Sequence, residues 1–284
     1  MKVYTPTYSG DHGEVVANGH KWYVIDAMNN TQDSSIPFAE QPTIGDVYLE
    51  NTDWDTTFNR WDWQNVYGAV DAGNGKVYGI PFGSPYVNIL NTGTSTSTWG
   101  TDEVRGNAPL KSDHSQPWNR TNLSKYIGGV LASNGHIYSH GHKARSILKI
   151  NVTTDEVTEI PYPTHIVNQM IDPEPEQQEI MFGDVHVPYR PAGYYPELTG
   201  NTPRCASYGS VLGPDGKVYN VPRGIPYLIW IDPTDDSIDY MDISSELTET
   251  KVGSSSSWYG AGVTHGDSIF YAPEKAKVIL KVTV

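Results

Sequence analysis

Short apolar stretches rich in Val, Ile and Tyr alternate along the chain with Asn-Gly or Asp-Gly pairs, and this pattern recurs. Asn-Gly and Asp-Gly pairs supply the positive φ of a tight hairpin turn, and the flanking residues are typical of strands. Each copy therefore predicts two antiparallel strands joined by a hairpin. The copies are 67–78, 126–138, 208–219 and 259–271, with a looser first copy over 13–23.

A third apolar stretch follows each clear hairpin and ends at Leu90, Ile150, Ile231 and Val282. Alternating residues over 156–160 and 237–241 predict a fourth strand in two copies. The copies recur at about 50 to 60 residues, which is the spacing of propeller blades. One interval, from Tyr138 to Tyr219, is longer. It holds either a degenerate extra blade or an insertion between Pro161 and Arg204.

The repeats predict an all-β fold, in which residues 1–284 form a single β-propeller domain of five or six blades. The residues Lys2 to Thr5 form a short strand without a partner in their own copy. We expect this strand to become the outer strand of the last blade, which closes the ring and removes an exposed edge. An open solenoid is the alternative architecture.

Composition excludes several classes of function. The net charge of −14 repels nucleic acid on average, and no apolar run approaches the ~20 residues of a membrane span. No apolar leader follows Met1, so we expect no secretory signal. The single cysteine, Cys205, precludes an intramolecular disulfide. We interpret it as a small buried side chain, with a catalytic thiol as the alternative.

Aromatic residues supply the candidate binding site, since the chain has 19 Tyr and 8 Trp. A dense group lies around Trp54, and tyrosines that precede each first strand should lie where the loops converge. The loops after the second strands, which add cations, should emerge at the same end. Packing between blades and plain exposure are the alternatives. The candidate ligand-binding residues are Trp54, Trp61, Trp63, Tyr67, Tyr126, His142, Arg145, Tyr208, Arg223, Trp258 and Tyr259.

Motifs of common enzymes are absent from the sequence, including the P-loop, Gly-x-Ser-x-Gly and His-Glu-x-x-His. We therefore predict no catalytic residue, no metal ligand and no cofactor. His136, His140 and His142 are the nearest approach to a metal cluster, because their spacing places them on one face of a strand. His140, however, aligns with Ile80 and Val221 of other copies, which indicates a structural position.

The units resemble kelch-like β-propeller repeats of the type Asn-Gly-Lys-Val-Tyr-x-Ile-Pro. That motif runs from Asn74 to Pro81 and, with Asp in place of Asn, from Asp215 to Pro222. The acidity, the single cysteine and the richness in Tyr, Trp, Ser, Thr and Asn also resemble phage virion proteins. These resemblances imply the propeller fold and a place in a virion, with the cytoplasm as the alternative.

The sequence therefore favours a non-enzymatic propeller that acts by recognition or as a structural part. It would be a tail-fibre or head-decoration module that binds a host surface glycan or another virion protein, and a homo-oligomer is compatible with this role. The alternative is a propeller lyase or hydrolase with a metal-assisted site in the central channel, because streptogramin lyases have similar blades. The His136 group is the candidate site for that alternative.

Overall fold

The computed structural model describes part of the chain. The described residues are 2–6, 21–26, 31–37, 66–82, 84, 86–104, 125–170, 179–182, 185–188, 205–247 and 258–284. They form antiparallel sheets with one short α-helix, so the predicted all-β class is confirmed. No helix in these ranges is long and apolar enough to cross a membrane. The predicted aromatic residues Trp54, Trp61 and Trp63 lie outside the described residues.

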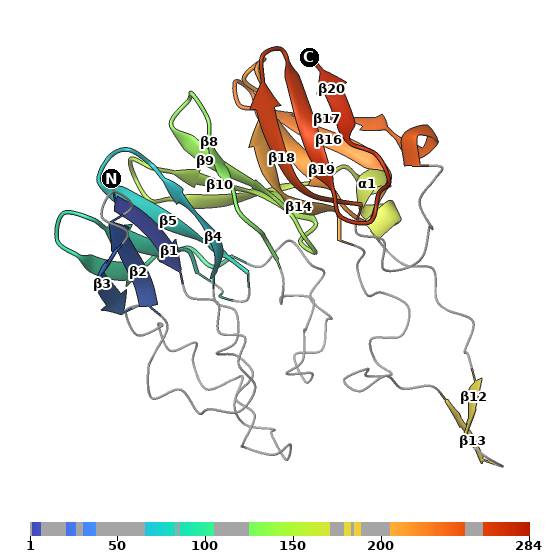
Figure 1. Cartoon of the computed structure of the whole chain (residues 1–284), viewed down its shortest axis with the longest axis horizontal. Helices are drawn as coiled ribbons and strands as arrows, with labels where there is room; N and C mark the ends of the chain where they lie inside the picture. Colours follow the sequence, from blue (N-terminus) through green and yellow to red (C-terminus); the bar gives the residue numbers. More distant parts are fainter. Residues whose placement is uncertain are drawn as a thin grey trace.

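Five sheets of three or four strands follow one another in chain order and lie side by side as an arc (Figure 1). The first three sheets have the following strands. They are β1 (Lys2–Pro6), β2 (Lys21–Asp26) and β3 (Thr31–Pro37); β4 (Val66–Asp71), β5 (Lys76–Pro81), β6 (Asn88–Asn91) and β7 (Thr96–Trp99); and β8 (Val130–Leu131), β9 (His136–His140), β10 (Ser146–Asn151) and β11 (Val157–Pro161).

The later part of the chain continues the same pattern after a small interruption. The short helix α1 (Thr164–Met170) and a two-stranded ribbon separate the third and fourth sheets. The remaining elements are β12 (Glu179–Phe182), β13 (Val185–Pro188), β14 (Ser207–Leu212), β15 (Val218–Pro222), β16 (Tyr227–Asp232), β17 (Ser237–Asp242), the 3-10 helix η5 (Ser244–Leu247), β18 (Tyr259–His265), β19 (Ser268–Pro273) and β20 (Leu280–Thr283). The expected fourth strands are confirmed as β11 and β17.

The hairpin turns form as the sequence predicts. Gly75, Gly135 and Gly216 adopt φ values of 86°, 78° and 82°, a region that costs glycine little because it has no Cβ. The residue before each glycine accepts a hydrogen bond from the amide two positions later, as Asn74 Oδ1 does from Lys76 N at 3.0 Å. The Asn-Gly and Asp-Gly pairs therefore determine where strands one and two of each sheet meet.

The core lies between the sheets, so the middle sheets are buried on both faces. Ile137 belongs to the cluster between the second and third sheets, whereas its neighbour Tyr138 belongs to the cluster between the third and fourth. Val218 and Tyr219 divide in the same way between the next two clusters. Because successive strand residues point to opposite faces, each second strand needs apolar residues at consecutive positions.

A hydrogen-bonded contact recurs between consecutive sheets. Tyr78 Oη donates to Asp155 Oδ1 at 2.5 Å, and Tyr138 Oη donates to Asp236 Oδ1 at 2.8 Å. In each case the tyrosine is the third residue of the second strand of one sheet, and the aspartate lies just before the fourth strand of the next. A lysine joins each pair, with Lys149 Nζ 2.5 Å from Asp236 Oδ2. We call this arrangement the tyrosine–aspartate contact.

The N-terminal strand does not occupy the predicted position. Lys2–Pro6 pairs antiparallel with β2 along its whole length, from Lys2 opposite Asp26 to Pro6 opposite Trp22. It therefore belongs to the first sheet, and its expected role as outer strand of the last sheet is wrong. The last sheet has the order β18-β19-β20 in the described part of the chain. Ring closure and the blade count accordingly stay predictions.

Strand register corrects two equivalences that the sequence suggested. Tyr78, Tyr138 and Tyr219 pair with Ile89, Lys149 and Trp230, and Phe270 pairs with Lys281 at the same place. Phe270 is thus their counterpart, although the sequence aligned Tyr271. The four tyrosines before the first strands also fall into two structural positions. Tyr259 pairs with Pro273, and Tyr126 bridges to Gly141 at the equivalent place. In the other two sheets Val66 and Ser207 hold that position, and the tyrosine comes one residue later.

Candidate functional site

One residue of each middle sheet comes to the same end of the arc, directly after the second strand. Phe82, His142 and Arg223 each lie four residues after the second-strand tyrosine. Their carbonyl oxygens accept the same hydrogen bond from the next sheet, at 2.8, 2.7 and 3.2 Å, respectively. The donors are the amides of Lys125, Ala206 and Trp258. We call the boundary between consecutive sheets the seam. This repeated backbone hydrogen bond fixes one residue position of each middle sheet at the seam, and the side chain at that position differs from copy to copy.

Two tyrosines complete the group. Tyr67 and Tyr208 directly follow Val66 and Ser207, which pair with Pro81 and Pro222 at the start of the two first strands. The hydroxyl oxygens of the two tyrosines are 2.9 Å apart. The ring of Tyr67 lies 5.4 Å from that of Phe82, and the ring of Tyr208 lies 5.9 Å from that of His142. We call Tyr67, Phe82, His142, Tyr208 and Arg223 the seam cluster. Residues from three sheets meet in it.

Arg223 contributes the positive charge of the cluster. Its guanidinium carbon lies 3.9 Å from the centre of the Tyr208 ring, within the range of a cation–π contact. One of its terminal nitrogens, Nη1, is 3.5 Å from Glu274 Oε2 but has no hydrogen-bond partner among the described residues. A stacked guanidinium keeps its in-plane N–H groups free for an anion. The Glu274 side chain is 39% exposed.

His142 links the seam cluster to Cys205. Its Nδ1 lies 2.6 Å from the carbonyl oxygen of Ser207, and its Nε2 lies 3.2 Å from Cys205 Sγ. A carbonyl oxygen only accepts, so Nδ1 carries the proton and donates it to Ser207, which leaves the Nε2 lone pair facing the thiol. Burial lowers the pKa of His142 to about 4, and the nearby cations Arg223 and Lys143 act in the same direction. The imidazole is therefore neutral at pH 7.

The Cys205 thiol stays protonated at rest. Burial raises its pKa, and the positive charges of Lys143 and Arg223 offset this only in part. The residue as a whole is partly exposed. A nucleophile within hydrogen-bond reach of a base, with the base oriented by a third group, is the arrangement that activates thiols and hydroxyls in catalysis. Cys205, His142 and the Ser207 carbonyl meet this geometric requirement.

The structure brings together only part of the predicted site. Tyr67, His142, Tyr208 and Arg223 meet, whereas Tyr126 and Tyr259 are fully buried and Trp258 is 3% exposed. Tyr126 Oη contacts Ser146 Oγ at 2.6 Å and donates to Glu159 Oε1 at 2.5 Å, so its hydroxyl group is engaged within its own sheet. Arg145 is partly exposed, desolvation lowers its pKa, and no hydrogen bond, ion pair or ring contact joins it to the other predicted residues among those described.

The sequence did not point to Phe82 as a member of the site, and Cys205 was interpreted from it as a small buried side chain. The available signal was the fourth position after each second-strand tyrosine, where Phe82, His142 and Arg223 differ in chemistry while the residues around them repeat. Cys205 left no such signal, because its proximity to His142 arises only when the third and fourth sheets pack together.

The three histidines of the metal hypothesis do not converge. His140 is fully buried, with Nδ1 3.1 Å from Tyr162 Oη and Nε2 3.0 Å from the Val218 carbonyl oxygen. His136 Nδ1 instead lies 3.2 Å from the carbonyl oxygen of Asn134. Within the described ranges, no group of three or more His, Cys, Asp or Glu side chains is placed to hold a metal ion. The structural interpretation of His140 fits its partners.

Comparison with known proteins identifies the fold. No family model matches the sequence, and no curated protein matches it. A streptogramin B lyase structure superposes with a TM-score of 0.50 at 14% identity, covering 93% of this chain and 62% of its own. A protein from Lactobacillus plantarum gives a TM-score of 0.52 at 12% identity, covering 99% of this chain and 62% of its own. The chain thus spans less than two thirds of either structure, and its fold is a β-propeller.

These comparisons correct one expectation and leave another without support. The prediction that the protein is not an enzyme is overturned, because a propeller that matches nearly the whole chain is a lyase. At 14% identity the likeness establishes the fold and not the reaction. Neither structure is described as a kelch or phage protein, so the kelch and virion resemblances gain no support from them.

Proposed function

We propose that the protein binds an anionic ligand at the seam cluster, and that acidic sugars are the class of ligand it takes. The observation that carries this proposal is the Arg223 guanidinium, stacked on Tyr208 with a buried Nη1 that lacks a hydrogen-bond partner among the described residues. Lys143 adds further positive charge at the same place. This local cationic group stands out in a chain of net charge −14.

The tyrosines support a sugar as the body of the ligand. Tyr67 and Tyr208 are both partly exposed, and their hydroxyl groups lie side by side. Aromatic faces pack against the C–H faces of sugars, while hydroxyl groups exchange hydrogen bonds with sugar hydroxyls. A carboxylate or sulfate on the sugar would then bind Arg223 in place of Glu274. A host surface glycan as this ligand, and a location in a virion beside other virion proteins, remain predictions.

Binding measurements with acidic and neutral oligosaccharides test this proposal. We expect an acidic sugar to bind, and Arg223→Ala to weaken the binding at least about tenfold, because a charge-assisted contact is lost. Lys217→Ala is the matched control, since Lys217 is 3.6 Å from Asp215 in a surface hairpin and away from the cluster. Equal affinity for neutral and acidic sugars, or equal losses in the two variants, would contradict the proposal.

A second candidate function is hydrolysis of an ester at the same place, and the Cys205–His142 geometry favours it. His142 Nε2 would take the thiol proton while Sγ bonds to the acyl carbon. The leaving alcohol would take that proton, and water would then hydrolyse the thioester with His142 again as the base. Arg223 and Lys143 would stabilise the negative charge that develops on the acyl oxygen.

Activity assays on acidic-sugar esters separate the two candidates. In the hydrolase, Cys205→Ser and His142→Asn should lower the rate at least about a hundredfold, while Cys205→Ser leaves sugar binding unchanged. Alkylation of Cys205 by iodoacetamide should abolish turnover in step with labelling. Turnover that persists in Cys205→Ser would exclude the thiol mechanism and leave ligand binding as the proposed function.

A further inference from the structure

The outer edge of the last sheet differs from the corresponding edges of the second, third and fourth sheets. In those sheets the third strand pairs with a fourth, as β10 does with β11. In the described part of the chain β20 pairs with β19 alone, so no described strand occupies its other side. Such an edge is a template for pairing with another extended chain.

A buried hydroxyl group points to what this edge lacks. Tyr259 is fully buried, and its hydroxyl group has no hydrogen-bond partner among the described residues. Tyr126 is its counterpart in the third sheet by strand register, and there the hydroxyl group donates to Glu159 on the fourth strand. An unsatisfied buried hydroxyl group is costly, and native proteins rarely leave one.

Register defines where the missing acceptor belongs. Glu159 lies opposite Leu148, and Leu148 pairs with Ser139. In the last sheet Leu280 pairs with Tyr271 at the equivalent place. A carboxylate opposite Leu280 on an added strand would therefore take the role that Glu159 has in the third sheet.

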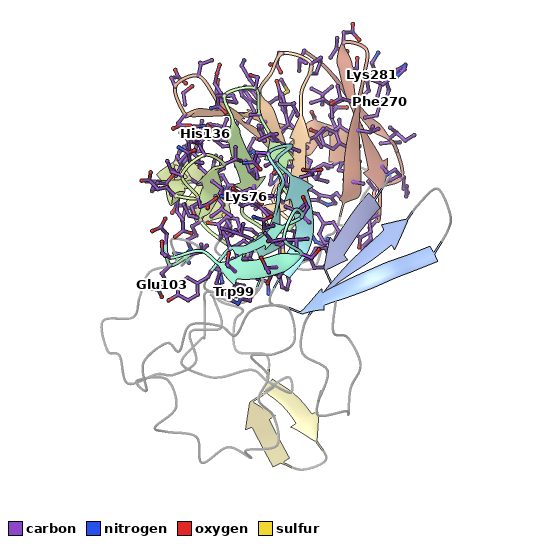
Figure 2. All side chains as sticks on the ribbon, turned by 90° about the vertical axis from the view of Figure 1, so that its left-hand side faces the viewer. Lys76, Trp99, Glu103, His136, Phe270 and Lys281 are labelled. Carbon is purple, nitrogen blue, oxygen red and sulfur yellow. The ribbon has the colours of Figure 1, made fainter. Side chains whose placement is uncertain are left out.

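The side chains around the edge suit an acidic, partly apolar strand. Ile279 and Val278 are 65% and 49% exposed, respectively. Lys277 and Lys281 are also exposed in this segment of an acidic protein. Figure 2 shows Lys281 beside Phe270 at the end of the last sheet, with Lys281 Nζ 5.7 Å from the Phe270 ring centre. Apolar contact and charge complementarity would thus both favour such a strand.

We propose that the free edge of β20 binds an extended acidic segment of a partner protein. The segment adds to the last sheet as an antiparallel fourth strand, places an apolar side chain over Ile279 and accepts a hydrogen bond from Tyr259 through a carboxylate opposite Leu280. This is strand addition, in which backbone hydrogen bonds supply affinity and side chains supply specificity. The inference is independent of the proposed sugar binding.

A synthetic peptide of residues 155–162 is the probe, because it contains the chain's own fourth strand with Glu159. We expect it to bind the whole protein with a Kd of ~100 µM by calorimetry, and the Glu159→Gln peptide to bind about tenfold more weakly. The protein variant Tyr259→Phe should fold normally, since the hydroxyl group it loses has no partner among the described residues. It should bind both peptides equally.

Two further variants locate the site. Ile279→Asp should weaken binding of the acidic peptide at least about tenfold by repulsion and loss of apolar contact. Val263→Asp, which changes an exposed apolar residue on β18 at the far side of the sheet, should leave binding unchanged. The proposal is overturned if neither peptide binds, if Tyr259→Phe still discriminates between the peptides, or if sedimentation shows a dimer of this chain that the peptide does not dissociate.

Discussion

Acidification from pH 6.5 to pH 4 is expected to lower the free energy of unfolding by about 3 kcal/mol for each of His140 and His142. Burial lowers the pKa of both imidazoles from 6.5 to about 4. Both rings have their two nitrogens engaged by partners that suit the neutral form. The two histidines together are expected to lower the free energy of unfolding by about 6 kcal/mol, which is comparable with the whole stability of many domains.

The direction of this effect follows from proton binding. Between pH 6.5 and 4 the unfolded chain protonates these histidines while the folded protein does not, so protons favour unfolding. The stability that the neutral rings provide is fully present above pH 6.5 and is lost as the pH falls towards 4. Urea unfolding at half-unit pH steps measures it through the midpoint and the slope.

His140→Val isolates one of the two contributions. Val221 and Ile80 hold the same position in neighbouring sheets, so the fold accepts an aliphatic side chain there. We expect the variant to lose about half of the pH dependence between 6.5 and 4. His136→Gln, on the same strand but partly exposed, is the control and should keep it. Wild-type pH dependence in His140→Val would show that folding does not lower the pKa of His140.

Turn chemistry and strand composition were readable from the sequence because they are local. Asn74-Gly75 and its counterparts determine their own hairpins, and alternating residues are sufficient to indicate β11 and β17. The register between strands was harder to predict from the sequence. Tyr126 precedes Val130 by one residue more than Tyr67 precedes Val70. Tyr126 therefore corresponds to the buried Val66 by strand register, and not to Tyr67 of the seam cluster.

Packing between sheets could not be read from the sequence. His142 and Cys205 are 63 residues apart, and Tyr67 and Tyr208 are 141 apart, so no local pattern records either contact. The strand β1 could pair with β2 or with the outer strand of the last sheet, and its sequence alternation is compatible with both. In the structure it pairs with β2. The site was therefore found in part through its repeating position, and its chemistry became visible only through contacts between distant segments.

Replacing Asp236 by Ala is expected to lower the free energy of unfolding by about 3 kcal/mol, because three effects add. Tyr138 loses a charged acceptor for its buried hydroxyl group, and Lys149 loses its ion pair. Alanine must also adopt the φ of 59° at this turn, a conformation that aspartate and asparagine tolerate better. The side chain of Asp236 is 33% exposed, so solvent screening reduces the contribution of the ion pair.

Asp236→Asn separates these effects, because asparagine keeps both the turn preference and a hydrogen-bond acceptor for Tyr138. We expect it to cost about 1 kcal/mol, measured by urea unfolding beside Asp236→Ala. The double variant Asp236→Ala with Tyr138→Phe should be less destabilised than the sum of its single changes, since both remove the same bond. Strict additivity would mean that Tyr138 and Asp236 do not interact. The tyrosine–aspartate contact would then follow from sheet packing rather than contribute to it.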